Sequence, residues 1–424
     1  MKKFYKVIFL LAITLTSQSK LFAQQVLIDA ELRPRFELRN GYKQLSDSSK
    51  TAYYGVSQRS KLNLKYQSNN LSAKISFHDV RTWGEEQLKT DVAGIALYEA
   101  WAEIKIVDSL TLKAGRQELI YDNQRLLSNN NWSQKAVTHD AALFKFKRNS
   151  FSVDMAAAFN QSADDINFGT DYKVAKNYKT FNFIWLTKKF GGLSVSAVGI
   201  ADGYQKRKTT NTLYLRQTYG PVVTYNKNDF SAATRVFYQT GRDTAGSAIN
   251  AYYANLDISY TFFKKLNILA GTEYISGNDA TDTDNKQVNC FSTLCGSGHT
   301  FNGGIDYFTD MPLHTRCAGL VDGYLNISYK FTDKISVRAD YHSFMLQNKY
   351  VSKGEVINKN LGSEIDLSCK INISKETSLQ FGYSILFATK SMETIQNKGT
   401  DKDKIAQWGW VMLTIKPTFF KSEK

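Results

Sequence analysis

Long hydrophobic runs are scarce in this chain of 424 residues. Beyond residue 23 no segment offers eighteen consecutive apolar residues, which excludes a membrane-spanning helix there. Four prolines exclude collagen-like and proline-rich architectures, and four cysteines are too few for a disulfide scaffold. The five histidines show neither His-Glu-x-x-His nor His-x-His spacing, so no zinc site and no cofactor is predicted.

Acidic residues are also fewer than basic residues. The chain has 54 Lys and Arg against 39 Asp and Glu, a formal charge of +15. Such an excess favours an anionic partner, which includes nucleic acid, a membrane surface or an acidic solute. Apolar residues make up 42% of the chain, enough to exclude a wholly disordered protein.

The N-terminus narrows these options. Lys2, Lys3 and Lys6 precede a nine-residue apolar stretch, and Ala23 ends a plausible cleavage site. The stretch is too short to cross a membrane, so residues 1–23 are predicted to be a secretory signal peptide. Residues 24–424 then form the mature protein, predicted to be one domain. Export from the cytoplasm argues against a nucleic-acid partner.

The mature chain alternates with a period of two. In residues 29–39 every odd position is charged, and the even positions are Ala30, Leu32, Pro34, Phe36 and Leu38. A strand places these two sets on opposite faces, and eleven residues suffice to cross a bilayer at a tilt. Eighteen such segments are predicted, at 27–40, 52–68, 71–81, 95–107, 109–118, 138–148, 150–160, 178–190, 193–202, 212–225, 229–240, 250–263, 266–275, 318–331, 335–347, 358–373, 377–390 and 405–419.

The links between these segments alternate strictly in length. Eight are tight turns such as Asn69-Asn70 and Gly191-Gly192, and nine are long, the longest at 276–317. Short periplasmic turns and long extracellular loops are typical of outer-membrane barrels. We therefore predict an all-β fold, an antiparallel transmembrane barrel of about 18 strands in the bacterial outer membrane. A soluble sandwich or propeller would have shorter strands and a less regular pattern of links.

Charged residues within the strands must face the lumen or the rims, because the lipid face is apolar. Parity places Arg33, Arg35 and Arg39 inward on the first strand, and Arg59 and Lys61 inward on the second. A basic, water-filled lumen concentrates anions. The alternative is that these side chains only neutralise carboxylates on neighbouring strands.

Three stretches resemble the alginate export family of outer-membrane barrels. They are AGRQEL at 114–119, followed by Arg125 and Trp132; LRPRFE at 32–37; and GHTFNG at 298–303. The resemblance implies an 18-stranded barrel whose arginine-rich constriction passes a polyuronate or another anion. Arg116 and Arg125 join the predicted constriction mainly through this resemblance, and Arg81 joins it as the last residue of the third strand.

The longest loop, 276–317, is predicted to face outward and fold over the pore. It holds Cys290, Cys295 and Cys317, of which Cys290 and Cys295 are candidates for a disulfide, while the pairing of Cys317 stays open. Cys369, in a strand, is expected to be free. The same loop, 276–317, also holds Asp279, Asp282, Asp284 and Asn285. These residues are more readily explained as a solvated acidic loop than as a Ca²⁺ site, since EF-hand spacing is absent.

The predicted function is an outer-membrane channel for anionic solutes or an alginate-like polysaccharide. A general diffusion porin is the alternative, and a barrel whose loops bind an outside partner is a third hypothesis. No Gly-x-Ser-x-Gly motif is present, so an enzyme is not predicted. The expected partners are outer-membrane lipid and the anionic cargo, and periplasmic export proteins are further candidates.

Overall fold

The computed structural model describes residues 24–46, 51–87, 94–161, 177–205, 212–396 and 405–422. The predicted signal peptide, residues 1–23, lies outside these ranges. Helix in the described part is limited to two loop segments, α2 (Met311–His314) and α3 (Lys390–Gln396). Neither is long and apolar enough to cross a membrane.

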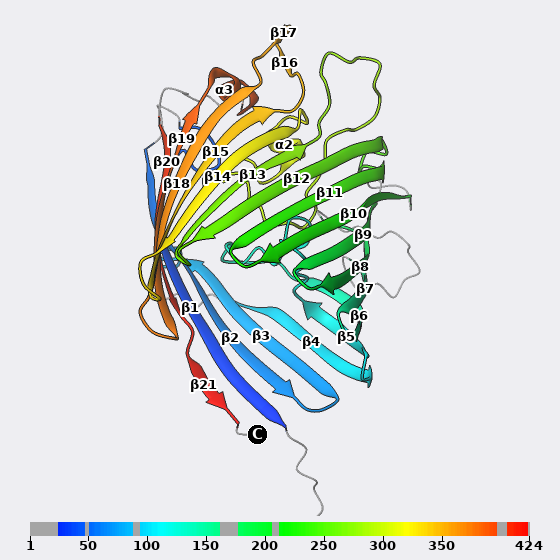
Figure 1. The fold of residues 1–424 in the computed structure, drawn as a ribbon, viewed down its shortest axis with the longest axis vertical. Coiled ribbons are helices and arrows are strands. Elements are labelled where there is room, and N and C mark those ends of the chain that lie inside the picture. Colours follow the sequence, from blue (N-terminus) through cyan, green and yellow to red (C-terminus); the bar gives the residue numbers. More distant parts are fainter. Residues whose placement is uncertain are drawn as a thin grey trace, which may run out of the picture.

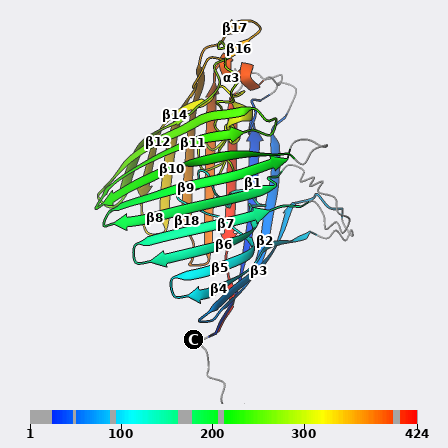
Figure 2. The same cartoon turned by 90° about the vertical axis from the view of Figure 1, so that its right-hand side faces the viewer.

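Eighteen antiparallel strands close into one barrel (Figures 1 and 2). Their bounds are β1 (Gln25–Asn40), β2 (Tyr53–Gln67), β3 (Leu71–Thr82), β4 (Ile95–Val107), β5 (Leu110–Gln117), β6 (His139–Arg148), β7 (Phe151–Phe159), β8 (Thr180–Phe190), β9 (Leu193–Gln205), β10 (Leu213–Lys227), β11 (Phe230–Arg242), β12 (Ala248–Phe262), β13 (Leu266–Ile275), β14 (Leu320–Lys330), β15 (Ile335–Leu346), β18 (Asn360–Asn372), β19 (Thr377–Ala388) and β20 (Ala406–Ile415) with β21 (Thr418–Lys421). A separate hairpin, β16 (Val351–Ser352) and β17 (Glu355–Val356), stands above the barrel.

The barrel closes between its first and last strands. β1 pairs with β2 on one side and with β20 and β21 on the other. The last strand is interrupted at Pro417, which has no N–H for the ladder, while the Pro417 carbonyl still accepts a hydrogen bond from the Ala30 N–H at 3.0 Å. Both halves keep their pairing to β1, so no open edge remains, as a membrane barrel requires.

The predicted alternation of turns and loops is confirmed. The links after β2, β4, β6, β8, β10, β12, β14 and β18 contain two to four residues each, and all of them lie at one end of the barrel, the short-turn end. The remaining links lie at the long-loop end. Predicted and observed strands agree to within a few residues, and all eighteen predicted segments are strands.

Side-chain burial follows the predicted parity on β1. Glu31, Arg33, Arg35 and Glu37 are buried inside the barrel, whereas Leu32 and Phe36 are exposed on the outside. Charged residues inside and apolar residues outside are the reverse of a soluble protein. This inversion suits a strand that has lipid on one side and a polar lumen on the other.

Candidate functional site

The loop between β5 and β6 passes inside the barrel, where the inward arginines of β1 hold it. Arg33 donates to the Asn131 carbonyl at 2.8 Å and to Gln134 Oε1 at 3.0 Å, and Arg35 donates to the Trp132 carbonyl at 2.9 Å. Arginine offers five N–H donors and suits a stretch of backbone carbonyls. Both arginines are buried by these contacts, so they bind the loop rather than the open lumen.

Arg59 on β2 completes this attachment. It forms an ion pair with Glu31 on β1 and donates to Asn131 Oδ1 at 2.8 Å. No part of Arg59 is exposed to solvent, and its charge is matched by the Glu31 carboxylate. The alternative of neutralised wall charges therefore describes Arg59, and it also describes Arg35, whose Nε lies 3.2 Å from Glu37 Oε2. Arg33 serves mainly as an anchor for the loop.

A second loop, between β13 and β14, also enters the barrel. Residues 280–284 are exposed, as the predicted outward orientation of residues 276–317 requires. That prediction is wrong for the later part of the loop, where the Asn302 amide donates to Glu273 and the Ile305 N–H donates to Glu364, both inward residues of the wall. The loop has an apolar core of its own, in which Phe291, Ile305 and Tyr307 have no exposed surface. Tyrosine and phenylalanine bury large areas, and this burial is the physical reason for the inward path.

Arg125 joins the two loops to the wall. Its guanidinium lies 2.5 Å from Glu273 Oε2 on β13 and donates to Asn302 Oδ1 at 2.9 Å. Asn302 in turn donates to Asp322 on β14 at 3.0 Å. Arg125 lies inside the lumen, as predicted, but it is fully buried and paired.

Backbone donors fix the tip of the second loop. The Ile305 N–H donates to Glu364 Oε1 at 2.8 Å, and the Gly304 N–H donates to Asp366 Oδ2 at 3.2 Å. The preceding Gly303 has φ +86°, and a Cβ there would lie 2.6 Å from the Glu364 carboxylate. Only glycine permits both this conformation and this close approach.

An aromatic cluster seals the contact between the loops and β20. Trp132 stacks on His299, with ring centroids 4.1 Å apart, and meets Trp410 edge-on at 4.9 Å. His299 Nδ1 lies 2.7 Å from Asp306 Oδ1. Burial alone would raise the pKa of Asp306, but the adjacent His299 and the Tyr42 hydroxyl hold that pKa below its ordinary value. Asp306 therefore stays ionised and keeps His299 in place.

Two of the predicted cations remain accessible in the lumen. The Arg39 side chain is 36% exposed and forms an ion pair with Glu37 at 2.9 Å. The Lys61 ammonium lies 4.9 Å from the centre of the Tyr98 ring and forms no ion pair with the described residues. Lys113 on β5, which the sequence analysis did not single out, is similarly placed 3.9 Å from the centre of the Trp101 ring.

Arg81 and Arg116 do not line the lumen, and their predicted place in the constriction is wrong. Arg116 pairs across the strands with Asp140, which alternates with the buried His139 and Ala141 and therefore faces outward. The register pairs Arg81 with Gln58, next to the inward Arg59, so Arg81 also faces outward. Each makes an exposed ion pair, with Asp79 and Asp140 respectively.

A match to a family model covers residues 25–400, and the description of that family is alginate export. The chain belongs to the alginate export family. No curated protein sequence matches it significantly.

Solved structures from Pseudomonas aeruginosa show the same fold. They include OpdL (TM-score 0.63, 12% identity, 93% of this chain and 99% of that one) and OccK3, also called OpdO (0.62, 13%, 93% and 96%). A third is OpdK with vanillate (0.60, 9%, 94% and 99%). Family and fold together place this protein in the bacterial outer membrane as a channel, with short turns at the periplasmic end and long loops outside.

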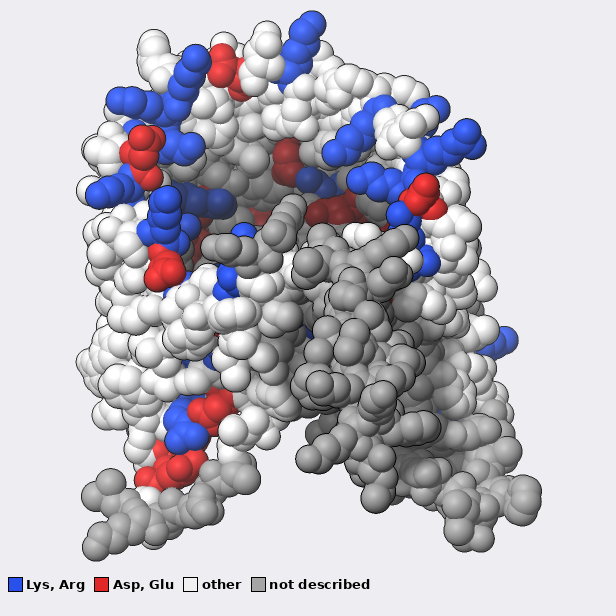
Figure 3. All heavy atoms as spheres, turned by 90° about the horizontal axis from the view of Figure 1, so that it is seen from below, with Lys and Arg blue, Asp and Glu red and all other residues white. Residues whose placement is uncertain are grey.

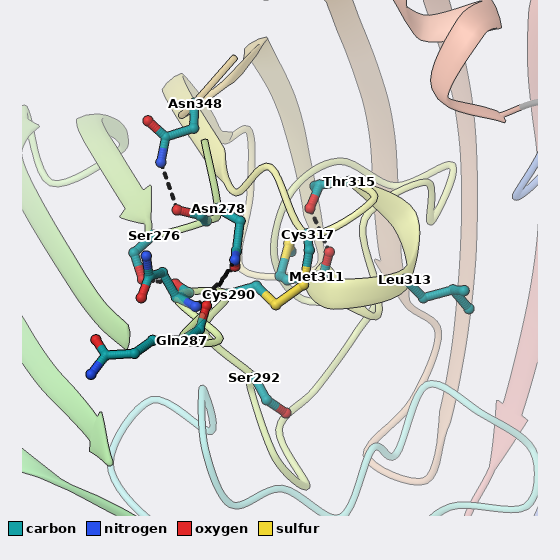
Figure 4. Close-up of a disulfide and its surroundings, with 12 residues drawn as sticks. Ser276, Asn278, Gln287, Cys290, Ser292, Met311, Leu313, Thr315, Cys317 and Asn348 are labelled. Atoms are coloured by element: carbon teal, nitrogen blue, oxygen red, sulfur yellow. Dashed lines mark hydrogen bonds between the residues drawn. A yellow bond between two sulfur atoms is a disulfide. The ribbon is translucent and has the colours of Figure 1, made fainter. Parts of the chain in front are cut away.

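This protein has one disulfide, Cys290–Cys317, within the loop between β13 and β14 (Figure 4). The candidate pair Cys290–Cys295 is therefore wrong, while the open possibility for Cys317 is resolved. Cys295 is unpaired, and Cys369 is free as expected. The bond ties Cys317, three residues after the end of α2, to Cys290 in the same loop, and the compartments outside the inner membrane permit it.

The disulfide predicts a specific count of reactive thiols. Denatured protein should take up two equivalents of a thiol-alkylating reagent, at Cys295 and Cys369, and four after reduction, measured by mass spectrometry. The disulfide spans a sequence separation of 27 residues, and by restricting the unfolded chain it raises the free energy of unfolding by about 3–4 kcal/mol. Four reactive thiols before reduction would contradict the observed pairing.

Several residues that shape the site carry no recognisable sequence signal. Glu273, Glu364 and Asp366 look like ordinary inward polar positions of alternating strands. Their importance comes from loop atoms that contact them. Trp132 and His299 belong to the stretches that resemble the family, and that likeness was the only sequence signal for them.

Proposed function

We propose that this protein is a passive channel selective for anions, with its aperture set by the two inserted loops. The observation that carries the proposal is the pair Lys61 and Lys113 on the lumenal wall, neither of which has an ion-pair partner among the described residues. An unpaired ammonium in a narrow, partly desolvated passage attracts an anion more strongly than one in bulk water.

The arrangement of charge supports a favoured side for anions. Figure 3 shows, from below, a hollow in which side chains of both signs lie. Lys61 and Lys113, which have no ion-pair partner among the described residues, belong to β2 and β5, while Asp366, a carboxylate without such a partner there, belongs to β18 across the barrel. Anions would pass along the β2–β5 side.

The size of the cargo follows from the loops. Because both loops occupy the lumen, small organic anions are the cargo that the described conformation favours. The structure of OpdK with vanillate, an aromatic carboxylate, is consistent with cargo of that size in a similar fold. An alginate-like polyuronate would need the loops to move, and partners in the periplasm remain a prediction.

Reversal potentials in a planar bilayer under a KCl gradient test the proposal. The wild-type channel should prefer Cl⁻ over K⁺, and Lys61→Gln with Lys113→Gln should bring the permeability ratio close to one. The matched control is Arg81→Gln with Arg116→Gln, which removes two cations from the outer face and should leave the ratio unchanged.

The other possible results of this measurement each favour a different function. A wild-type channel indifferent to charge would favour the general porin. A correctly inserted barrel without any conductance would favour loop-mediated binding of an outside partner. Equal losses of selectivity in both double variants would show that total charge, and not lumenal position, sets the preference.

A further inference from the structure

A cavity of about 240 Å³ lies between the tip of the second loop and the barrel wall. Gly303 and Gly304 form its roof, and Arg338, Asp366 and Trp410 are among its wall residues. A smaller cavity of about 130 Å³ shares Thr300, Arg338 and His342 with it and extends toward Tyr324. Arg338 lies three residues from the periplasmic start of β15, so the wall below the loop tip faces the periplasm.

The larger cavity has a flat aromatic wall. A Cβ at Gly382 would lie 2.6 Å from Cε2 and Nε1 of Trp410, so the indole lies directly over the glycine backbone. Any larger residue at position 382 would lift the indole off the sheet. Trp132 meets Trp410 edge-on, and Trp408 also lines the cavity. The result is a fixed aromatic surface, as cation recognition requires.

The same cavity has negative charge that the described residues do not balance. Asp366 Oδ2 accepts a hydrogen bond from the Gly304 N–H. Behind it lies Glu364, which is completely buried and hydrogen-bonded to Asp366, so the two carboxyl groups share a proton and carry one negative charge between them. Neither group forms an ion pair with a described Lys, Arg or His, and a buried negative charge without a counter-charge is costly.

The neighbouring cations are already committed to other carboxylates. Arg338 donates to both oxygens of Asp340 at 2.7 and 2.8 Å. His342 contacts Asp322, and His299 contacts Asp306. Even with both imidazoles protonated, these pairs would do no more than balance themselves, and the one negative charge that Asp366 and Glu364 share would still lack a counter-charge.

We propose that this cavity binds an organic ammonium ion, with its charge against Asp366 and its body on the Trp410 surface. A carboxylate supplies a charge-assisted hydrogen bond, and an indole face attracts a cation while covering apolar groups. A small inorganic cation would not need the aromatic wall, and a neutral solute would leave the carboxylates uncompensated. The site goes beyond anion passage, because it occupies the opposite side of the lumen.

The test uses three solutes with the same sugar ring and different charge: glucosamine, glucose and glucuronate, at pH 6 in a planar bilayer. Glucosamine added from the periplasmic side should reduce the single-channel current at concentrations where glucose and glucuronate do not. From the extracellular side the loops should weaken this block. Equal block by glucose would overturn the proposal, as would equal block by Mg²⁺ that Trp410→Leu leaves unchanged.

Two variants address the two halves of the site. Asp366→Asn and Trp410→Leu should each raise the half-blocking concentration of glucosamine at least about threefold. Asp140→Asn, which removes a carboxylate from the outer face, is the control and should change nothing. Block unaffected by Asp366→Asn, an isosteric change that retains a folded channel, would overturn the proposal. Chloride preference is measured without blocker on the same channels, so failure of the ammonium site and failure of the anion channel are distinguishable.

Discussion

Removing residues 279–316 should raise single-channel conductance at least about twofold, because this loop occupies lumen that an 18-stranded barrel otherwise leaves open. The ends of the loop are already adjacent: a Cβ on Gly277 would clash with the backbone of Ala318 and Gly319. The strands on either side can therefore be rejoined without disturbing the β13–β14 ladder, which begins at Ile275 and Leu320.

A matched deletion tests whether a change in conductance comes from a wider aperture or from a general disturbance of the barrel. Removing residues 352–355 shortens the β16–β17 hairpin, which stands above the barrel and outside the lumen (Figure 1). That variant should keep the wild-type conductance. If removal of 279–316 also leaves conductance unchanged in correctly inserted channels, then the β5–β6 loop alone sets the aperture.

Alternation predicted the barrel because lipid imposes it on every strand. Each outward position that contacts lipid must be apolar, whereas outward positions near the rims can be charged, as Arg81 and Arg116 are. The apolar pattern therefore recurs in all eighteen strands, and turn residues separate them. The same parity placed Arg33, Arg35 and Arg59 correctly. Arg81 was misplaced because its position was taken from the end of its strand and not from the register with β2, in which its neighbour Val80 pairs with Arg59.

The loops have no such periodic constraint. Their inward path depends on contacts between distant parts of the chain, such as Arg33 with Asn131 and Trp132 with His299. Arg116 could not be placed from its motif either. The resemblance to the family indicates that the residue matters, but it does not say on which face of the strand the side chain lies. Which cysteine pairs with Cys290 likewise depends on the folded path of the loop, not on spacing.

The buried ion pair between Arg125 and Glu273 should be the most sensitive single contact in the constriction. The two side chains are 2% and 3% exposed, and the guanidinium is the only cation that forms an ion pair with Glu273 among the described residues. Arg125→Met would leave a buried carboxylate with only the neutral donors Tyr253 and Asn302, a loss of about 3–5 kcal/mol. Both loops should loosen, because Arg125 and Asn302 belong to different loops.

Limited proteolysis of the folded protein in detergent measures that loosening as the rate of cleavage within residues 119–138. Arg125→Met and Glu273→Gln should each accelerate cleavage, whereas the double variant should recover much of the protection, since neither charge is then left unpaired. The control is the exposed pair Arg116–Asp140, 41% and 55% exposed, where Arg116→Met should cost at most about 1 kcal/mol. Additive losses in the Arg125 and Glu273 double variant would mean that packing, and not the paired charge, holds the two loops together.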